Sequence, residues 1–295
     1  MYQVSLDLSE NQIQLLEDVL YEIAPSNWYI LQNRLLSNGK LEGFFEHYGD
    51  IEKSMMELNN LCTIKVPFES SKIEKLKRED WTNAYKFHFK PWSFKNFHWI
   101  PLWEKNTFIV PGGQKAFYID PSVAFGTGTH ETTKLCLQRL VTLEENLNEC
   151  NRSVLDVGCG SGIIAITAEL LGFSEVLGID NDLDAIRVSR ENACVNNCPN
   201  VEFKQKDLAD LVETQIQNDL IFANIQADVL VNNSENLIGL LSIQSHLILS
   251  GILANEAAEV EKIFKKELKL KFKSVKTELE KLNEWVAIIF ELSNP

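Results

Sequence analysis

Three glycines and a carboxylate in residues 154–180 could together bind a nucleoside. Gly158, Gly160 and Gly162 alternate with small residues directly after an apolar run. Glycine lets the backbone turn sharply and brings amide N–H groups closer to a ligand than a Cβ would permit. Asp180 follows about 20 residues past this turn, where a carboxylate can accept hydrogen bonds from both hydroxyls of a ribose. We therefore expect Gly158, Gly160 and Asp180 to contact a nucleoside ligand.

The spacing of the glycines distinguishes between two kinds of nucleoside. A dinucleotide-binding turn has the pattern G-x-G-x-x-G, whose last glycine brings a helix N-terminus close to a pyrophosphate. Ile163 holds that last position here, and Asp156 precedes the turn. The result resembles the first motif of the Rossmann-like S-adenosylmethionine-dependent methyltransferases. A carboxylate suits the cationic methionine end of that cofactor and would repel a pyrophosphate. The alternative is that the glycines serve only packing.

Residues 120–133 form a second polar segment with ligand-binding potential. The sequence DPSVAFGTGTHETT combines glycines with threonines and leads into a helix. Such a loop can lie over a bound nucleoside, and we assign Thr133 to the cofactor site. The alternative is that Thr129 or His130 only caps the helix. Capping needs one hydroxyl and does not require this density of glycine and threonine, but the role of His130 stays open.

Two further candidates lie where predicted strands end. Asn224 follows the apolar strand 219–223, and open α/β sheets hold their ligands at the carboxyl ends of their strands. We therefore assign Asn224 to the site. Asp207 follows the strand 201–204, where its carboxylate could accept a hydrogen bond from an adenine amino group.

The elements around these residues predict an α/β fold. Strand and helix patterns alternate, which is typical of a doubly wound parallel sheet. A closing antiparallel hairpin is typical of the methyltransferase version of this fold. The predicted strands are residues 154–157, 175–180, 201–204, 219–223 and 246–250, with 270–277 and 285–292 as the hairpin; the predicted helices include 163–171, 182–197 and 254–268.

The N-terminal residues predict a separate small domain. Strand and helix patterns follow one another in the order β-α-β-β-α-β, which is the ferredoxin-like arrangement. Ser9 and Gln12 form a capping box at the first helix. No catalytic constellation is present, so we interpret this part as a recognition or scaffolding domain. The predicted strands are residues 2–8, 28–36, 41–46 and 61–68, the second helix is 50–59, and Asn38-Gly39 is a predicted hairpin turn.

These patterns divide the chain into three parts. We expect a ferredoxin-like substrate-recognition domain at 1–72, an aromatic-rich linker at 73–115 and a methyltransferase domain at 116–295. The linker contains a predicted helix at 79–89 and four tryptophans that either pack the two domains together or form a docking surface for substrate. These tryptophans are Trp81, Trp92, Trp99 and Trp103.

The composition limits the partners and the compartment. The chain has 295 residues, enough for two domains, and a formal net charge of −14. That charge argues against direct binding to nucleic acid and is more compatible with a basic partner, although many proteins are acidic for solubility alone. No apolar run reaches membrane-spanning length and the N-terminus alternates as a strand, so we expect a cytoplasmic protein without membrane contact. Six cysteines lack a C-x-x-C pair, which indicates reduced thiols and no metal site.

Five segments together resemble the PrmA family, which methylates the large-subunit ribosomal protein L11 with S-adenosylmethionine. They are AFGTGTHETT, LDVGCGSGIIAI, GIDNDLDAI, ANIQADVL and LILSGIL. The resemblance runs from about Trp81 to the C-terminus, and residues 1–71 share only the pattern of elements. It implies that Thr133, Gly158, Asp180 and Asn224 contact the cofactor. One departure is Ser122, where the family commonly has glycine.

The implied reaction is in-line displacement of the sulfonium methyl by an amine. The methyl donor is already activated, so catalysis depends mainly on positioning. An amine with a pKa of about 10.4 must first lose its proton, which a partly apolar pocket favours. We assign Asn224 to orienting the amine or the cofactor. Related enzymes that act on planar substrates carry an aromatic residue after this position, whereas Ile225 and Gln226 follow here, which favours lysine side-chain and N-terminal amines.

Three alternatives stay open on the sequence alone. The enzyme could methylate lysine in another protein, such as an electron-transfer flavoprotein subunit. It could instead be a nicotinamide-dinucleotide oxidoreductase, which would bind that cofactor and not S-adenosylhomocysteine. It could also be a binding module that retains the fold without catalysis. In each case we expect a monomer.

Overall fold

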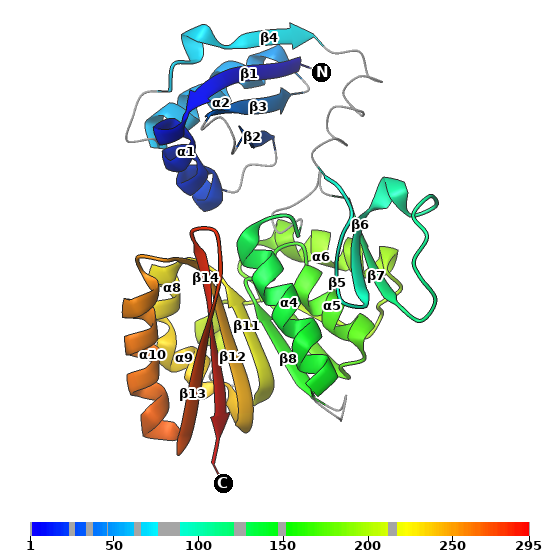
Figure 1. Cartoon of the computed structure of the whole chain (residues 1–295), viewed down its shortest axis with the longest axis vertical. Helices are drawn as coiled ribbons and strands as arrows, with labels where there is room; N and C mark the ends of the chain where they lie inside the picture. The colour runs from blue at the N-terminus through cyan, green and yellow to red at the C-terminus, as the bar shows by residue number, and fades with distance from the viewer. Residues whose placement is uncertain are drawn as a thin grey trace. The chain divides into compact units, whose positions relative to one another are not determined.

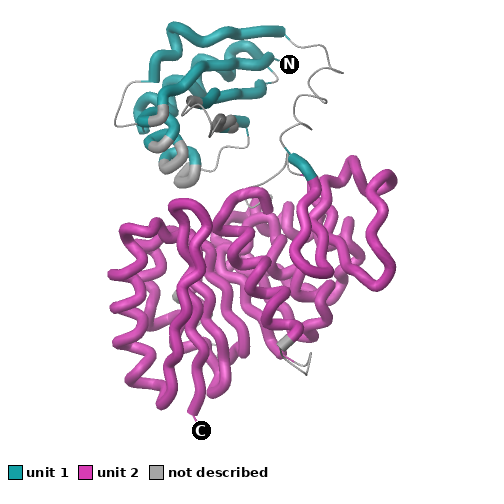
Figure 2. Tube along the Cα trace, in the orientation of Figure 1, with its two compact units in different colours: residues 1–90 teal, residues 91–295 magenta. Residues whose placement is uncertain are grey.

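The computed structural model describes residues 2–23, 27–33, 38–45, 47–61, 66–75, 89–120, 128–146, 152–211 and 217–294. The chain folds into two compact units, residues 1–90 and residues 91–295 (Figure 2). Each unit has its own hydrophobic core.

The first unit is a four-stranded antiparallel sheet with two helices (Figure 1). The strand order is β2-β3-β1-β4. The elements follow in the order β-α-β-β-α-β, as the sequence predicts, while the ferredoxin-like assignment stays a prediction. They are β1 (Tyr2–Ser9), α1 (Glu10–Ile23), β2 (Trp28–Asn33), β3 (Asn38–Phe45), α2 (Tyr48–Leu61) and β4 (Lys72–Lys75), with a 3-10 turn at Phe68–Ser70.

The first unit begins with a strand whose side chains alternate between buried and more exposed positions, followed by a capped helix. Val4, Leu6 and Leu8 point into the core, at most 3% exposed. At the start of α1, the Gln12 side chain accepts a hydrogen bond from the Ser9 N–H at 2.9 Å. This bond satisfies a backbone donor that the helix leaves free, as in half of the predicted capping box. Ile13, one turn along, is then directed into the core.

Two local predictions in this unit are wrong. The strand predicted at 61–68 is absent from its described residues, because α2 continues to Leu61 and the fourth strand lies at Lys72–Lys75. The side chains of β4 are all exposed, so no apolar alternation marks it. Asn38-Gly39 is not a turn, since both residues pair within β3 with Asn33 and Gln32. The helix predicted at 79–89 lies almost wholly outside the described residues.

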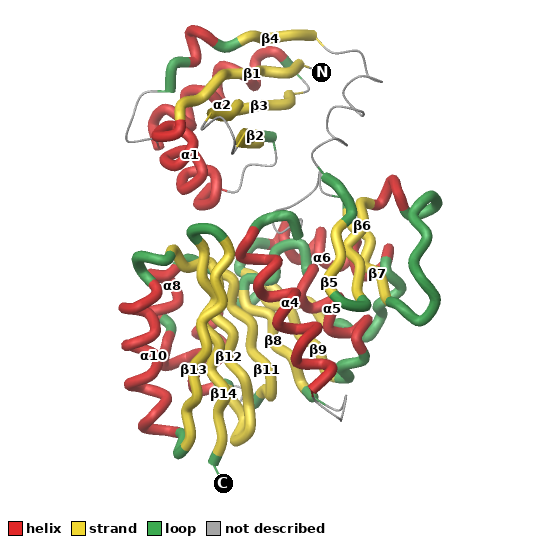
Figure 3. Tube along the Cα trace, in the orientation of Figure 1, coloured by secondary structure: helices red, strands yellow, loops and turns green. Residues whose placement is uncertain are grey.

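The second unit is built on a seven-stranded sheet of order β10-β9-β8-β11-β12-β14-β13 (Figure 3). The first five strands are parallel, and β14 and β13 close the sheet as an antiparallel hairpin. The predicted doubly wound sheet with its closing hairpin is confirmed. The strands are β8 (Ser153–Val157), β9 (Glu175–Asp180), β10 (Glu202–Gln205), β11 (Asn218–Asn224), β12 (Leu241–Leu253), β13 (Ser274–Leu282) and β14 (Trp285–Ser293).

Helices cover both faces of this sheet (Figure 1). One face carries α4 (Glu131–Asn146), α5 (Ile163–Leu171) and α6 (Leu183–Val195), and the other carries α8 (Ala227–Asn232), α9 (Ser234–Gly239) and α10 (Ala257–Lys271). A short helix, α7 (Leu208–Leu211), follows β10. Among the described helices, none is both long and apolar enough to cross a membrane.

A small three-stranded sheet precedes the large one in the second unit. It consists of β5 (Trp92–Phe94), β6 (Phe97–Pro101) and β7 (Lys115–Ile119), and every residue of β6 is buried. The Trp99 indole donates a hydrogen bond to Thr167 Oγ1 of α5 at 3.2 Å, and the Trp92 ring stacks on Trp99. These two tryptophans therefore pack onto a helix of their own unit.

Candidate functional site

The turn between β8 and α5 has a backbone conformation that favours glycine. Gly158, Gly160 and Gly162 have φ angles of 67°, 50° and 76°. L residues avoid this left-handed region because of their Cβ atom. Space is also short, since a Cβ on Gly158 would lie 2.5 Å from Ile225 Cγ2, and one on Gly162 would lie 2.8 Å from the Phe203 ring. Both the backbone conformation and the neighbouring side chains therefore require glycine at Gly158 and Gly162.

The glycine turn is held by hydrogen bonds that its N–H groups donate to β9. The Gly160 N–H donates to Asp180 Oδ2 at 3.0 Å, and the Cys159 N–H donates to the Ile179 carbonyl at 2.9 Å. Asp180 is half-buried at the end of β9, and its other oxygen accepts from the Asp182 N–H at 3.0 Å. The structure thus brings together Gly158, Gly160 and Asp180.

Asp156 lies beneath the turn. It is 1% exposed, and its Oδ2 accepts a hydrogen bond from the Ala165 N–H at 3.1 Å, in the first turn of α5. Burial raises the pKa of this carboxyl to about 7; the Ala165 N–H opposes the rise and the nearby Asp180 charge adds to it. The sequence places this carboxylate at the cationic end of the ligand. In the structure Oδ2 accepts from the helix, and Oδ1 is buried and, among the described residues, has no hydrogen-bond partner.

Thr133 and Asn224 meet at the carboxyl ends of the parallel strands. Asn224 Nδ2 donates to Thr133 Oγ1 at 3.3 Å, so the end of β11 contacts the first turn of α4. Thr133 is 1% exposed. Asn224 Oδ1 is buried and, within the described part of the chain, accepts no hydrogen bond. A buried acceptor without a donor costs about 1–3 kcal/mol, which makes this oxygen a place for a ligand N–H.

The two parts of the site are joined through neighbouring residues. Ile225 directly follows Asn224, and its side chain packs over Gly158. Ser250, fully buried in β12, donates to the Thr132 carbonyl at 3.0 Å and pairs in register with Asn224. The sequence analysis named Ile225 only for its lack of an aromatic ring and did not identify Ser250, because a serine within a strand carries no signal of its own.

His130 acts at the start of α4. The Thr132 N–H donates to His130 Nδ1 at 3.3 Å, and the Thr132 hydroxyl lies 2.8 Å from the same nitrogen. Its ring also meets the Trp285 ring edge-on, with centroids 5.1 Å apart. Burial lowers the pKa of His130, which keeps the ring neutral and able to accept. These contacts support the capping alternative for His130.

Asp207 lies near the other end of the site. The Lys206 N–H donates to the carbonyl of Asp180, the last residue of β9, at 2.9 Å. Asp207 therefore directly follows a residue that is hydrogen-bonded to β9. Asp207 is exposed at this edge. Its contact with an adenine amino group stays a prediction.

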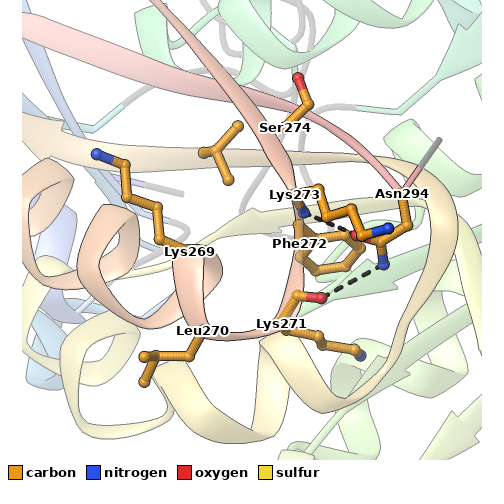
Figure 4. A pocket seen from close by; sticks show the side chains of 8 residues that line it. Lys269, Leu270, Lys271, Phe272, Lys273, Ser274 and Asn294 are labelled. Carbon is orange, nitrogen blue, oxygen red and sulfur yellow. Dashed lines mark hydrogen bonds between the residues drawn. The ribbon is translucent and has the colours of Figure 1, made fainter.

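A separate hollow of about 780 Å³ lies toward the other end of the parallel strands (Figure 4). It is lined by residues 269–275 and Asn294, and Lys271 Nζ donates to the Ile238 and Leu241 carbonyls at 2.6 and 3.0 Å. Leu241 pairs with Asn218, the first residue of β11, whereas Asn224 is the last. At about 3.3 Å per residue, the two ends of β11 are roughly 20 Å apart. This hollow is therefore remote from the glycine turn, and its lysine stabilises the end of α9.

Substitution of Gly158 by alanine tests the turn. We expect G158A to lower the free energy of unfolding by about 1–2 kcal/mol and to weaken binding of S-adenosylhomocysteine, because the new Cβ meets both the left-handed φ and Ile225. Gly112 is the matched control, since a Cβ there would meet nothing within 4 Å. Urea denaturation and calorimetric titration would measure both effects. If G158A matched G112A in both, the steric account of the turn would be wrong.

Asp156→Asn tests the buried carboxyl through its pH dependence. The folded-state pKa of about 7 lies above the ordinary aspartate pKa of 3.8. The folded protein therefore holds this proton more tightly, and the stabilisation present at low pH is lost as the pH rises through that range. Since asparagine does not titrate, we expect the unfolding free energy of the wild type to fall relative to D156N between pH 4 and 7, by at most about 1.4 kcal/mol per pH unit. A difference that stays constant over that range would show that Asp156 is already ionised when folded.

The sequence matches one family over nearly its whole length. Residues 7–293 match the family described as Ribosomal protein L11 methyltransferase (PrmA). A ribosomal protein L11 methyltransferase from Caldanaerobacter subterraneus subsp. tengcongensis is 34% identical over 289 residues, covering 93% of this chain and 87% of the relative. One from Haemophilus ducreyi is 37% identical over 232 residues, covering 78% and 75%.

A solved structure agrees with these sequence matches. The crystal structure of ribosomal protein L11 methylase from Lactobacillus delbrueckii subsp. bulgaricus superimposes with a TM-score of 0.60 at 25% identity, covering 70% of this chain and 100% of that one. The predicted Rossmann-like methyltransferase fold and the predicted S-adenosylmethionine dependence are thereby confirmed at the level of the family. The chain belongs to the PrmA family of methyltransferases.

Proposed function

We propose that this enzyme transfers methyl groups from S-adenosylmethionine to lysine side-chain and N-terminal amines of ribosomal protein L11. The relatives described above are named ribosomal protein L11 methyltransferases. The observation that carries the proposal is the buried Asn224 Oδ1, which accepts no hydrogen bond in the described part of the chain. An amine N–H is a donor that this oxygen can accept, and Asn224 itself is held by Thr133 at 3.3 Å.

The cofactor contacts that we propose use groups with spare capacity for hydrogen bonds. Each Asp180 oxygen accepts one backbone N–H and has a further lone pair for a ribose hydroxyl. Thr133 Oγ1 accepts from Asn224, which leaves its own hydrogen to donate to a ligand oxygen. Gly158 and Gly160 allow close approach to the backbone. S-adenosylmethionine, when bound, would supply an activated methyl group at this edge of the sheet.

The role of the protein in the reaction is then to position a neutral amine. Asn224 Oδ1 would accept one amine N–H and so direct the nitrogen lone pair toward the methyl carbon. As the N–C bond forms, the electrons of the C–S bond pass to sulfur and the surplus proton leaves to solvent. Ile225 and Gln226 offer no aromatic face at this strand end, which favours an aliphatic amine over a planar amide or base.

The first unit is the proposed substrate-recognition part, within the division 1–72, 73–115 and 116–295 stated above. Several large apolar side chains on its helix α2 are exposed: Tyr48, Met56 and Leu61 are 51%, 66% and 50% exposed. The net charge of −14 is compatible with a basic ribosomal protein as partner. We also propose that the enzyme is cytoplasmic and monomeric.

Methyl transfer from labelled S-adenosylmethionine to fractionated ribosomal proteins tests the proposal directly. The fractions would come from a strain that lacks the enzyme, and mass spectrometry would locate the label. We expect label on amines of L11, and we expect N224A to lower kcat about 100-fold because the amine loses its acceptor. Asn232 is the matched control, since it is exposed in α8 away from the site.

Two results would contradict the proposal in different ways. Label on lysines of another protein, with none on L11, would make the substrate wrong and keep the chemistry. Binding of S-adenosylhomocysteine without methyl transfer to any cellular protein would indicate a non-catalytic binding module.

A further inference from the structure

Trp92 of β5 is fixed on one side by a chain of contacts to α5. Its ring stacks on Trp99 with centroids 4.1 Å apart and planes inclined by 15°. Trp99 is 2% exposed and donates to Thr167 Oγ1 of α5 at 3.2 Å. Thr167 is fully buried. The position of Trp92 is therefore set by the same helix that begins at the glycine turn.

Trp92 also meets Lys134 in the first turn of α4 and borders the space beside Gly128. The Lys134 ammonium lies over the Trp92 ring, 5.8 Å from its centroid, and Lys134 directly follows Thr133. A Cβ on Gly128 would lie 3.8 Å from Trp92 Nε1 and 2.7 Å from Ile163 Cδ1. Trp92 and Ile163, the first residue of α5, thus both border the space beside Gly128, whose φ is 81°.

The indole nitrogen of Trp92 is a buried donor without an acceptor in the described part of the chain. Nε1 is buried and, among the described residues, donates no hydrogen bond. A buried N–H without an acceptor is unfavourable, and such groups are uncommon in folded proteins. Lys134, which lies over the Trp92 ring, directly follows Thr133, the residue that accepts from Asn224.

We propose that Trp92 is a positioning residue of the cofactor site, which sets the separation between Thr133 and the glycine turn. The inference rests on the proposed role of Thr133. The Trp99–Trp92 stack acts as a spacer between α5 and the start of α4, and the free indole N–H serves an acceptor oxygen that arrives in the bound state. At 3.3 Å the Thr133–Asn224 bond is already at the long end for a hydrogen bond, so a small displacement of α4 would break it.

Three variants separate this role from general stability. W92L removes the aromatic stack, and W92F retains a ring but removes the N–H. F94L is the control: it alters the same strand two residues from Trp92, away from the space beside Gly128. Calorimetric titration with S-adenosylhomocysteine, well below the unfolding temperature, would give the dissociation constants. We expect W92L to weaken binding more than about tenfold and W92F by about three- to tenfold, while F94L binds as the wild type does even if its Tm is lower.

A double-mutant cycle with T133V tests the route of the effect. If Trp92 acts through Thr133, W92L/T133V should bind no more weakly than T133V alone. Additive losses, wild-type binding by W92L, or equal weakening by F94L and W92L would each overturn the proposal. The readout is cofactor binding, so the identity of the methyl acceptor does not affect it. Failure of the proposed function would instead appear as missing label on L11 with the wild-type enzyme.

Discussion

The left-handed backbone of the glycine turn is the constraint on which the rest of the site depends. Gly158, Gly160 and Gly162 all have positive φ angles, and the spaces beside Gly158 and Gly162 are closed to a Cβ. Two carboxylates hold this conformation from opposite sides. Asp180 accepts the Gly160 N–H, and Asp156 accepts the Ala165 N–H beneath the turn. Burial, with a smaller contribution from the Asp180 charge, raises the pKa of Asp156 to about 7, so a free-energy cost accompanies this arrangement at neutral pH.

A second group of contacts brings the start of α4 to the same edge of the sheet. Ser250 of β12 binds the Thr132 carbonyl, Asn224 of β11 binds Thr133, and Ile225 reaches Gly158. Displacement of an activated methyl group needs little from the protein except accurate placement of the two reactants. A site assembled from the ends of several strands and the starts of two helices can supply that placement, because each of these elements is fixed in the core.

The sequence predicted the parts of this site that depend on short-range patterns. The strand at 175–180 agrees with β9 to the residue, since apolar residues and the terminal aspartate mark its ends, and the glycine turn follows from its spacing. Asn224 was predicted because it follows an apolar strand. In contrast, β4 has only exposed side chains and gave no alternation, and the short helices α8 and α9 were missed. The contact of Trp92 with Lys134 and the hydrogen bond between Asn224 and Thr133 join residues distant in sequence, so no local pattern could reveal them.

The central claim is that S-adenosylmethionine binds at the carboxyl edge of the sheet, against the glycine turn and Asp180. A crystal structure with S-adenosylhomocysteine tests it most directly. The account predicts the ribose hydroxyls within hydrogen-bonding distance of the Asp180 carboxylate and the amino-acid end beside Gly158. A nucleoside bound elsewhere in the protein, with the Asp180 carboxylate still contacting only backbone N–H groups, would contradict it.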